Sequence, residues 1–242
     1  MKILAIETAT EACSAALLIN DAQVIRNETE SNESEKSKII TRFQLAPREH
    51  TKLILPMLDE VLEEANIQLN VVDAIAFGRG PGAFTGLRIA AGVAQGVALS
   101  VDKPVIPVST LAALALKATE QVDFDQDKII VVALDARMEE VYWGKFKFTK
   151  GVLELRGKEQ VNKLEHLLNH VGKDPIVAIG NGWAVSSDPL PNNINFIENC
   201  LPSAEHIARL ALLLFKASKT VTIEEAQPVY IRNDVAKKSK IL

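Results

Sequence analysis

The residues with the clearest chemical potential form a glycine-rich loop, Gly78-Arg79-Gly80-Pro81-Gly82-Ala83-Phe84-Thr85-Gly86-Leu87-Arg88. An apolar run, Ala74–Phe77, precedes it and a segment of small apolar residues, Ile89–Leu99, follows, so we expect a strand, a glycine turn and a helix. Such a turn brings the backbone close to another group and exposes unpaired helix N–H groups. The loop is therefore predicted to bind an anion or to pack tightly against its surroundings. Its four glycines are Gly78, Gly80, Gly82 and Gly86.

Comparison with known phosphate-binding loops favours the packing interpretation. The loop lacks the Gly-Lys-Ser/Thr of a P-loop, because Gly86-Leu87-Arg88 stands where the lysine is needed. The spacing Gly78-x-Gly80-x-x-Ala83 matches a loose dinucleotide pattern, but Pro81 inside it makes the match poor. A structural turn is the favoured prediction.

Two acids, Glu7 and Asp135, each close an apolar strand, one in each half of the chain. If they faced each other across a cleft, they could hold Mg²⁺ beside phosphates. As turn residues, they could equally form local hydrogen bonds. The pattern leaves both interpretations open.

Other reactive side chains give little support for chemistry. His166 and His170 lie four residues apart on an expected helix, which suits one face of a metal site, but no third ligand is near in sequence. Cys13 and Cys200 are isolated, with no activating base in sight. We expect no catalytic residue, no metal and no cofactor.

Strand and helix patterns divide the chain into two units. Ile3–Ile6 with Ala12–Ile19, and 128–135 with 141–148, each read as an antiparallel hairpin followed by alternating strands and helices. This pattern predicts an α/β fold with two lobes, 1–108 and 109–242, whose final segment could return to the first lobe. A polar stretch, 27–38, is expected to extend a hairpin in the first lobe. Expected helices cover 50–65, 110–118, 163–171 and a last one capped at Ser203 that ends near Lys219; Ser109 is expected to cap the helix at 110.

Composition argues for an ordinary globular protein without a nucleic-acid surface. The 242 residues are 48% hydrophobic and 24% charged, with a net charge of −4, whereas nucleic-acid binding needs clustered Lys and Arg. The most apolar segment, Ile89–Val101, is short for a membrane span and carries Gln95 and Ser100. Two isolated cysteines fit a reducing compartment. We expect a cytoplasmic protein without a membrane segment.

Two expected helices of the first lobe are unusually apolar. Between Gly86 and Leu99 only Arg88 and Gln95 are polar, and the helix at 50–65 carries two adjacent apolar stripes. A helix that is apolar all round must be covered all round. Either the two helices cover each other within one core, or a partner covers their outer side.

Several blocks resemble the TsaB family, also called YeaZ. They are the N-terminal segment 1–17, Pro47-Arg48-Glu49-His50-Thr51, the glycine loop, Asp135-Ala136-Arg137-Met138-x-Glu140-Val141-Tyr142 and Pro228-Val229-Tyr230-Ile231-Arg232-Asn233. The resemblance implies the two-lobed actin-like fold of sugar kinases and Hsp70 ATPases (ASKHA). It also implies a non-catalytic dimerisation and scaffold subunit in the synthesis of threonylcarbamoyladenosine at tRNA adenosine 37.

The resemblance implies partners as well. They are the TsaD-type transferase, a TsaE-type ATPase in the same complex, and a second copy of the chain when it is alone, with little direct tRNA contact. The implied partner interface uses the two apolar helices, through His50, Leu53, Met57, Leu87, Ala90, Val93, Ala94 and Val97.

The resemblance leaves room for a weak nucleotide contact at Glu7, Asp135, Gly180 and Gly182. It predicts against a complete ATP site, because the turn after Asp135 has no glycine to bring backbone N–H groups onto a phosphate. The alternative is an ATP-dependent transferase or kinase-like enzyme of the same fold.

Overall fold

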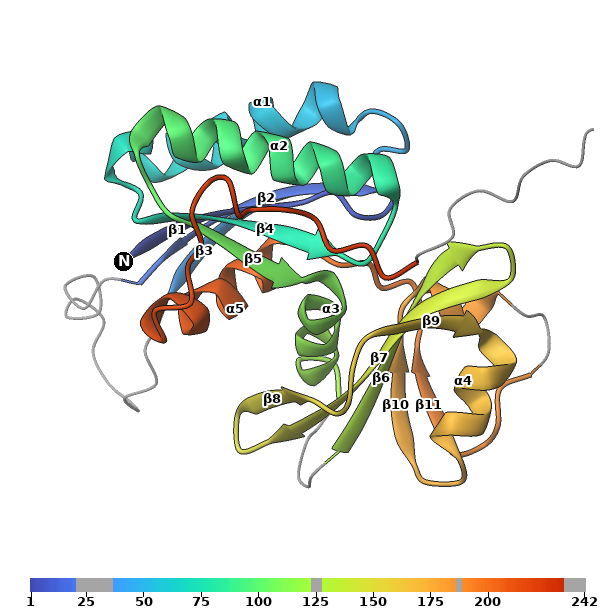
Figure 1. Cartoon of the computed structure of the whole chain (residues 1–242). Coiled ribbons are helices and arrows are strands. Elements are labelled where there is room, and N and C mark those ends of the chain that lie inside the picture. Colours follow the sequence, from blue (N-terminus) through green and yellow to red (C-terminus); the bar gives the residue numbers. More distant parts are fainter. Residues whose placement is uncertain (21–36, 123–127, 186–188, 233–242) are drawn as a thin grey trace, which may run out of the picture.

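The computed structural model describes residues 1–20, 37–122, 128–185 and 189–232, and it contains two β-sheets with helices against them (Figure 1). The first sheet has the order β3-β2-β1-β4-β5. Strands β1, β2 and β3 are antiparallel neighbours, whereas β4 and β5 run parallel to β1. The strands are β1 (Lys2–Glu7), β2 (Ala12–Ile19), β3 (Lys38–Leu45), β4 (Ala74–Gly80) and β5 (Val105–Ser109).

The second sheet repeats the plan of the first. Its order is β11-β10-β6-β7-β8, with β6 and β7 antiparallel and with β10 and β11 parallel to β6. The expectation that each unit begins with an antiparallel hairpin is therefore confirmed. The strands are β6 (Lys128–Arg137), β7 (Glu140–Thr149), β8 (Val152–Leu155), β9 (Gln160–Lys163), β10 (Ile176–Ile179) and β11 (Ile194–Ile197), and β9 pairs with β7.

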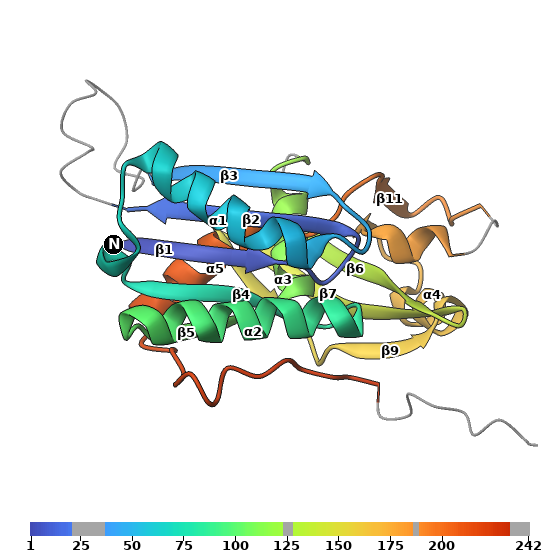
Figure 2. The same ribbon diagram turned by 90° about the horizontal axis from the view of Figure 1, so that it is seen from above.

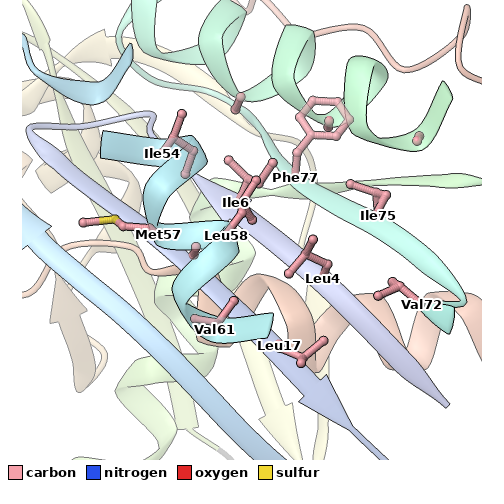
Figure 3. Close-up of a cluster of buried hydrophobic side chains, with 14 of the residues drawn as sticks. Leu4, Ile6, Leu17, Ile54, Met57, Leu58, Val61, Val72, Ile75 and Phe77 are labelled. Atoms are coloured by element: carbon pink, nitrogen blue, oxygen red, sulfur yellow. The ribbon is translucent and has the colours of Figure 1, made fainter. Parts of the chain in front are cut away.

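Helices α1 (His50–Ala65) and α2 (Phe84–Val101) lie side by side on one face of the first sheet (Figure 2). Helix α1 buries a stripe that includes Ile54, Leu58 and Val61 against β1, β2 and β4, as Figure 3 shows. The spacing of three and four residues is that of an amphipathic helix, so the core follows directly from the sequence pattern.

The opposite face of the first sheet is covered by α5 (Ala204–Lys216), although this helix follows the second sheet in the chain. Its small and branched residues Ala204, Ile207 and Ala208 pack on β1, β4 and β5. Helix α3 (Thr110–Thr119) leaves β5 and packs on the second sheet, whose other face is covered by α4 (Leu164–Val171). Short 3₁₀ helices cover Leu69–Val71 and Asn181–Ala184.

Several local expectations are confirmed and others are corrected. Helix α1 has the expected bounds, and the Ser109 side chain accepts a hydrogen bond from the Ala112 N–H at the start of α3. The last helix ends at Lys216 rather than near Lys219. The expected helix at 163–171 begins one residue later, because Lys163 ends β9. Most of the polar stretch 27–38 lies outside the described residues; its last residue, Lys38, begins β3.

Helix α2 is longer than the sequence pattern indicated. With 18 residues of apolar mean hydropathy, the helix is long and apolar enough, by length and composition alone, to cross a membrane. However, Ala90, Ala94 and Ala98 are fully buried in the core against the first sheet. One side of the helix therefore belongs to the core of the first lobe, and 33% of the span is buried.

Candidate functional site

The glycine loop at the end of β4 is filled by its own chain. A Cβ on Gly78 would overlap the Glu7 carboxylate, and one on Gly86 would overlap the Thr8 carbonyl oxygen. The Thr8 hydroxyl donates to the Gly86 carbonyl at 2.8 Å, and the Ala83 N–H donates to the Ala9 carbonyl at 2.7 Å. The loop thus packs on the turn between β1 and β2, and Gly80 and Gly82 are held close to Val229 and Ala9 in the same way.

Glu7 lies beneath this loop and not in an open cleft. Its Oε1 accepts from the Ala9 N–H at 2.6 Å and its Oε2 accepts from the Thr110 hydroxyl at 3.1 Å. The side chain is fully buried. Burial raises the pKa of the Glu7 carboxyl to about 7, although the two hydrogen bonds act in the opposite direction. The residue connects β1 to the start of α3.

The corresponding turn of the second lobe is also occupied by its own residues. Asp135 Oδ1 accepts from the Arg137 N–H at 2.7 Å, and its Oδ2 pairs with the Arg137 guanidinium at 3.0 Å. A Cβ on Gly180 would overlap the Ala133 carbonyl oxygen, and Gly182 also lies against Ala133. Both glycines therefore serve the packing of β10 against β6.

A cleft of about 780 Å³ lies between the two lobes. The first lobe contributes the β1–β2 turn and the start of α2, and the second contributes Asp135 and the β6–β7 turn. Of the four residues expected to contact a nucleotide, only Asp135 lines this cleft. Glu7, Gly180 and Gly182 do not, because each is packed against backbone or core.

The eight residues expected at a partner interface divide into two groups. Leu87, Ala90 and Ala94 are buried in the first lobe, so their side chains point inward; His50 and Met57 are nearly buried. Leu53, Val93 and Val97 are partly exposed and pack at the edge of the core. The choice of Leu87, Ala90 and Ala94 as outward-facing residues was wrong, since a helix that is apolar all round does not reveal which side faces the sheet.

The outer side of α2 exposes bare backbone. Gly92 and Gly96 are exposed, and a Cβ added at either would meet nothing within 4 Å. Ile89, Val93 and Val97 border them on one flank. We call the five residues Ile89, Gly92, Val93, Gly96 and Val97 the α2 stripe.

Helix α1 has a polar side beside the two apolar stripes expected on it. Lys52, Asp59, Glu60 and Glu63 are exposed along it, and Arg42 of β3 forms ion pairs of 2.7 Å with Glu60 and Glu64. Among the large apolar side chains of α1, Leu55 is 51% exposed, whereas Leu53 lies on the side of the helix that Glu60 and Glu64 turn toward β3. The uncovered apolar surface is therefore centred on α2.

The second flank of α2 is covered by the chain that follows α5. Gln95 Nε2 donates to the carbonyl oxygens of Ile223 and Ala226, at 3.1 and 3.2 Å, and Val221 forms a β-bridge with Val105. Ala226 is fully buried in the core. A return of the final segment to the first lobe was allowed for from the sequence, and these contacts have that form. The role of Gln95, one of two polar residues between Gly86 and Leu99, was not found from sequence.

The histidines take structural positions. His50 Nε2 lies 2.9 Å from the Thr10 carbonyl oxygen, so this nitrogen carries the proton. His170 Nδ1 lies 2.9 Å from the His166 carbonyl oxygen on the same helix. Within the described part of the chain, no three His, Cys, Asp or Glu side chains gather as a metal site would require.

A Ser-His-Glu arrangement was not anticipated. The Ser203 hydroxyl donates to His206 Nδ1 at 2.8 Å, and His206 Nε2 donates to Glu120 at 3.0 Å. Burial lowers the pKa of His206, which the Glu120 carboxylate opposes. Ser203 and His206 are buried where α5 begins, so the contacts anchor that helix to α3. Ser203 thus precedes α5 as expected, but its hydroxyl bonds a side chain and not a backbone N–H.

This chain is similar in sequence to known proteins along most of its length. A family model described as "TsaD: tRNA N6-adenosine threonylcarbamoyltransferase" matches residues 31–238. The Haemophilus influenzae protein named tRNA threonylcarbamoyladenosine biosynthesis protein TsaB is 38% identical, over 97% of this chain and 95% of its own length. The Escherichia coli protein of the same name is 39% identical, over 98% and 96%.

The solved structure of YeaZ from Pseudomonas aeruginosa is 37% identical, with a TM-score of 0.78 over 95% of this chain and 99% of its own. With the duplicated sheet plan, these matches confirm the α/β, two-lobed actin-like fold.

Proposed function

Since this chain belongs to the TsaB (YeaZ) family of tRNA threonylcarbamoyladenosine biosynthesis proteins, we propose that it serves as the non-catalytic subunit that binds and supports the TsaD-type transferase. It takes part in the synthesis of this modified nucleoside by holding its partner rather than by carrying out a chemical step. The binding surface is the α2 stripe together with the side of α1 that lies next to it.

The observation that carries this proposal is the pair of exposed glycines on α2. Glycine inside a helix lowers stability by about 1 kcal/mol relative to alanine. A protein tolerates this loss of stability where a larger side chain would clash with its own atoms. Nothing in the described chain lies within 4 Å of a Cβ at Gly92 or Gly96, so packing within the chain does not require glycine there. Two such residues one turn apart allow the backbone of a partner helix to approach closely.

The residues around the glycines suit burial. Ile89, Val93 and Val97 are partly exposed and follow one another at a spacing of four residues on the helix, so a partner would remove apolar surface from water. An interface of ordinary size buries about 1,600 Å² in total. The wider family includes the transferase itself, so a partner with related helices would supply a matching apolar surface.

The non-catalytic role is supported by the way in which the chain itself fills the turns at Glu7 and Asp135. Glu7 is covered by the glycine loop, and the turn after Asp135 is closed by Arg137. Arg137, Met138 and Glu139 replace the glycines that would open N–H groups to a phosphate. We therefore expect no turnover of ATP by this chain.

The other parts of the proposal follow from charge and family. The net charge of −4 supports a role with little direct tRNA contact. The same stripe would pair two copies of the chain when no partner is present. We place the protein in the cytoplasm, in a complex that also contains a TsaE-type ATPase.

The test is co-purification with the TsaD-type transferase of the same organism. Gly96→Glu puts a charge on the open side of α2 without touching the core, so we expect the fold to persist and binding to fall at least tenfold. Leu213→Glu on α5 is the matched control, since Leu213 is 59% exposed and lies on the opposite face of the first sheet. Equal recovery of the transferase with both variants would refute the proposed surface.

A further inference from the structure

The mouth of the cleft carries a concentrated set of exposed large side chains. Phe84, Met138, Val229 and Tyr230 line it and are 46%, 66%, 37% and 45% exposed. They come from three separate segments: the start of α2, the β6–β7 turn, and the chain after α5. Figure 1 and Figure 2 show this last segment passing beside α2 toward the second sheet. We call these four residues the mouth cluster.

The aromatic residues of the mouth cluster are held in place. The rings of Phe84 and Tyr230 lie 5.4 Å apart, and the Arg88 guanidinium lies 3.9 Å from the centre of the Phe84 ring. Arg88 Nε also donates to the Tyr230 hydroxyl at 3.3 Å. The backbone is fixed as well, because the Val229 N–H donates to the Arg79 carbonyl at 2.8 Å. Side chains that are already ordered lose little entropy when a ligand covers them.

The β6–β7 turn presents Met138 in a strained conformation. Arg137, Met138 and Glu139 all have positive φ, of 66°, 55° and 60°. A two-residue hairpin turn of this kind favours Asn-Gly, and non-glycine residues in this region cost of order 1 kcal/mol or more each. The turn therefore keeps Arg137 and Met138 exposed at the mouth at some expense of stability.

The charged groups around the mouth cluster are four arginines and, in the cleft lining, the carboxylates of Glu11 and Asp135. Arg48, Arg137 and Arg232 line the cleft, and Arg88 lies behind Phe84. Arg137 pairs with Asp135 and Arg232 pairs with Glu140. Among the residues that the structure describes, no carboxylate forms an ion pair with Arg48 or Arg88, and the buried Nε of Arg232 has no hydrogen-bond partner.

Charge argues against two possible ligands of the mouth cluster, namely the C-terminal segment of this chain and a second copy of the chain. The C-terminal residues 233–242 carry three lysines and one aspartate, so they do not complement an arginine-rich mouth. A second copy bound through the same mouth would bring arginines against arginines. A partner with acidic side chains fits both the charge and the exposed aromatic and methionine surface, since Arg, Tyr, Phe and Met are enriched in protein interfaces.

We propose that the mouth cluster is a second docking site, separate from the α2 stripe, for an extended acidic segment of a partner protein. A large apolar side chain of that segment packs against Met138 and the Phe84–Tyr230 pair. Flanking carboxylates pair with Arg48 and Arg88. Protein is favoured over RNA because the contact surface is largely apolar and the chain as a whole is acidic.

The test is selection of random 12-residue peptides displayed on phage against the full chain. Recovered peptides should carry net negative charge and at least one large apolar residue. The recovered peptides are then synthesised with a fluorescent label and measured by fluorescence polarisation. They should bind the wild-type chain, and their dissociation constant for the Met138→Asp variant should be at least tenfold higher. Aspartate tolerates positive φ better than most residues, so this variant should fold.

Two controls separate the mouth from other surfaces. Leu213→Asp adds the same charge at a site of similar exposure on α5 and should leave peptide binding unchanged, as should Gly96→Glu on the α2 stripe. The proposal is overturned if no peptide is enriched, if the enriched peptides lack acidic residues, or if Met138→Asp binds them normally. Binding of a 12-nucleotide single-stranded RNA that Met138→Asp abolishes, in place of peptide binding, would also overturn it.

Discussion

Replacing Gly92 and Gly96 together by alanine should make the isolated chain more stable and the complex weaker. Each alanine removes the entropy loss of a helical glycine, about 1 kcal/mol, and neither methyl group meets an atom of the described chain within 4 Å. The two gains should add, because the methyl groups do not share a partner. The free energy of unfolding should therefore rise by about 2 kcal/mol.

The same methyl groups should weaken binding to the partner. If a helix backbone lies against this part of α2, two added methyl groups overpack the contact, which typically costs about 1–3 kcal/mol. That loss corresponds to a roughly fivefold to 150-fold higher dissociation constant. Stability is measured by urea unfolding at low protein concentration, so that self-association does not contribute. Affinity for the TsaD-type transferase is measured by calorimetry.

The control is Ser100→Ala, which raises helix propensity at an exposed position near the end of the same helix. It should stabilise the chain slightly and leave affinity unchanged. A double-alanine variant that is more stable and binds the transferase normally would refute the argument that these glycines provide close approach. A less stable variant would show that the space above them is not open.

Three further predictions concern the interior. Glu7→Gln should remove one pH dependence of stability. The carboxyl pKa is about 7 in the folded chain against 4.5 unfolded, so the contribution of Glu7 to the free energy of unfolding is full below pH 4.5 and falls by about 3 kcal/mol as pH rises through 7. The difference between wild type and variant in urea unfolding should therefore change between pH 5 and 8, and a constant difference would contradict this. Gly86→Ala should destabilise the chain by about 3 kcal/mol, because its methyl group would overlap the Thr8 carbonyl oxygen; a wild-type melting temperature would show that the loop is loose. Gln95→Leu should remove two hydrogen bonds to the segment after α5 and so speed amide hydrogen exchange over residues 221–229. Unchanged exchange would mean that the buried Ala226 alone holds that segment.

Much of the fold was predictable because its signals are local. The bounds of α1 follow from apolar residues spaced by three and four, and the two hairpins follow from paired apolar runs around a polar turn. The glycine loop was correctly placed between a strand and a helix, since glycines bounded by an apolar run on each side leave few alternatives.

The orientation of α2 was not predictable. Nearly every side chain on it is apolar, so no alternation of apolar and polar residues tells the buried side from the exposed one. Ala94 and Val97 look alike in sequence, yet one is fully buried and the other is partly exposed. The two glycines proved the better guide to the outer side, since a helix facing its own core has little use for them at that spacing.

The contacts between distant segments were also out of reach. For Glu7 the sequence left open a cleft position and a locally bonded one. The structure buries its carboxylate against Gly78, where it accepts a hydrogen bond from the Thr110 hydroxyl, a contact between segments 103 residues apart. The mouth cluster joins α2, the β6–β7 turn and the chain after α5. Each of these segments is unremarkable alone, and only the three-dimensional arrangement brings them together.

The most direct test of the scaffold proposal is hydrogen exchange, followed by mass spectrometry, on the chain with and without its TsaD-type transferase. The proposal predicts strong protection of residues 87–99 and of the side of α1 next to α2 when the transferase is added, with α5 unchanged. Complex formation with protection confined to α5, or to the second sheet, would contradict it.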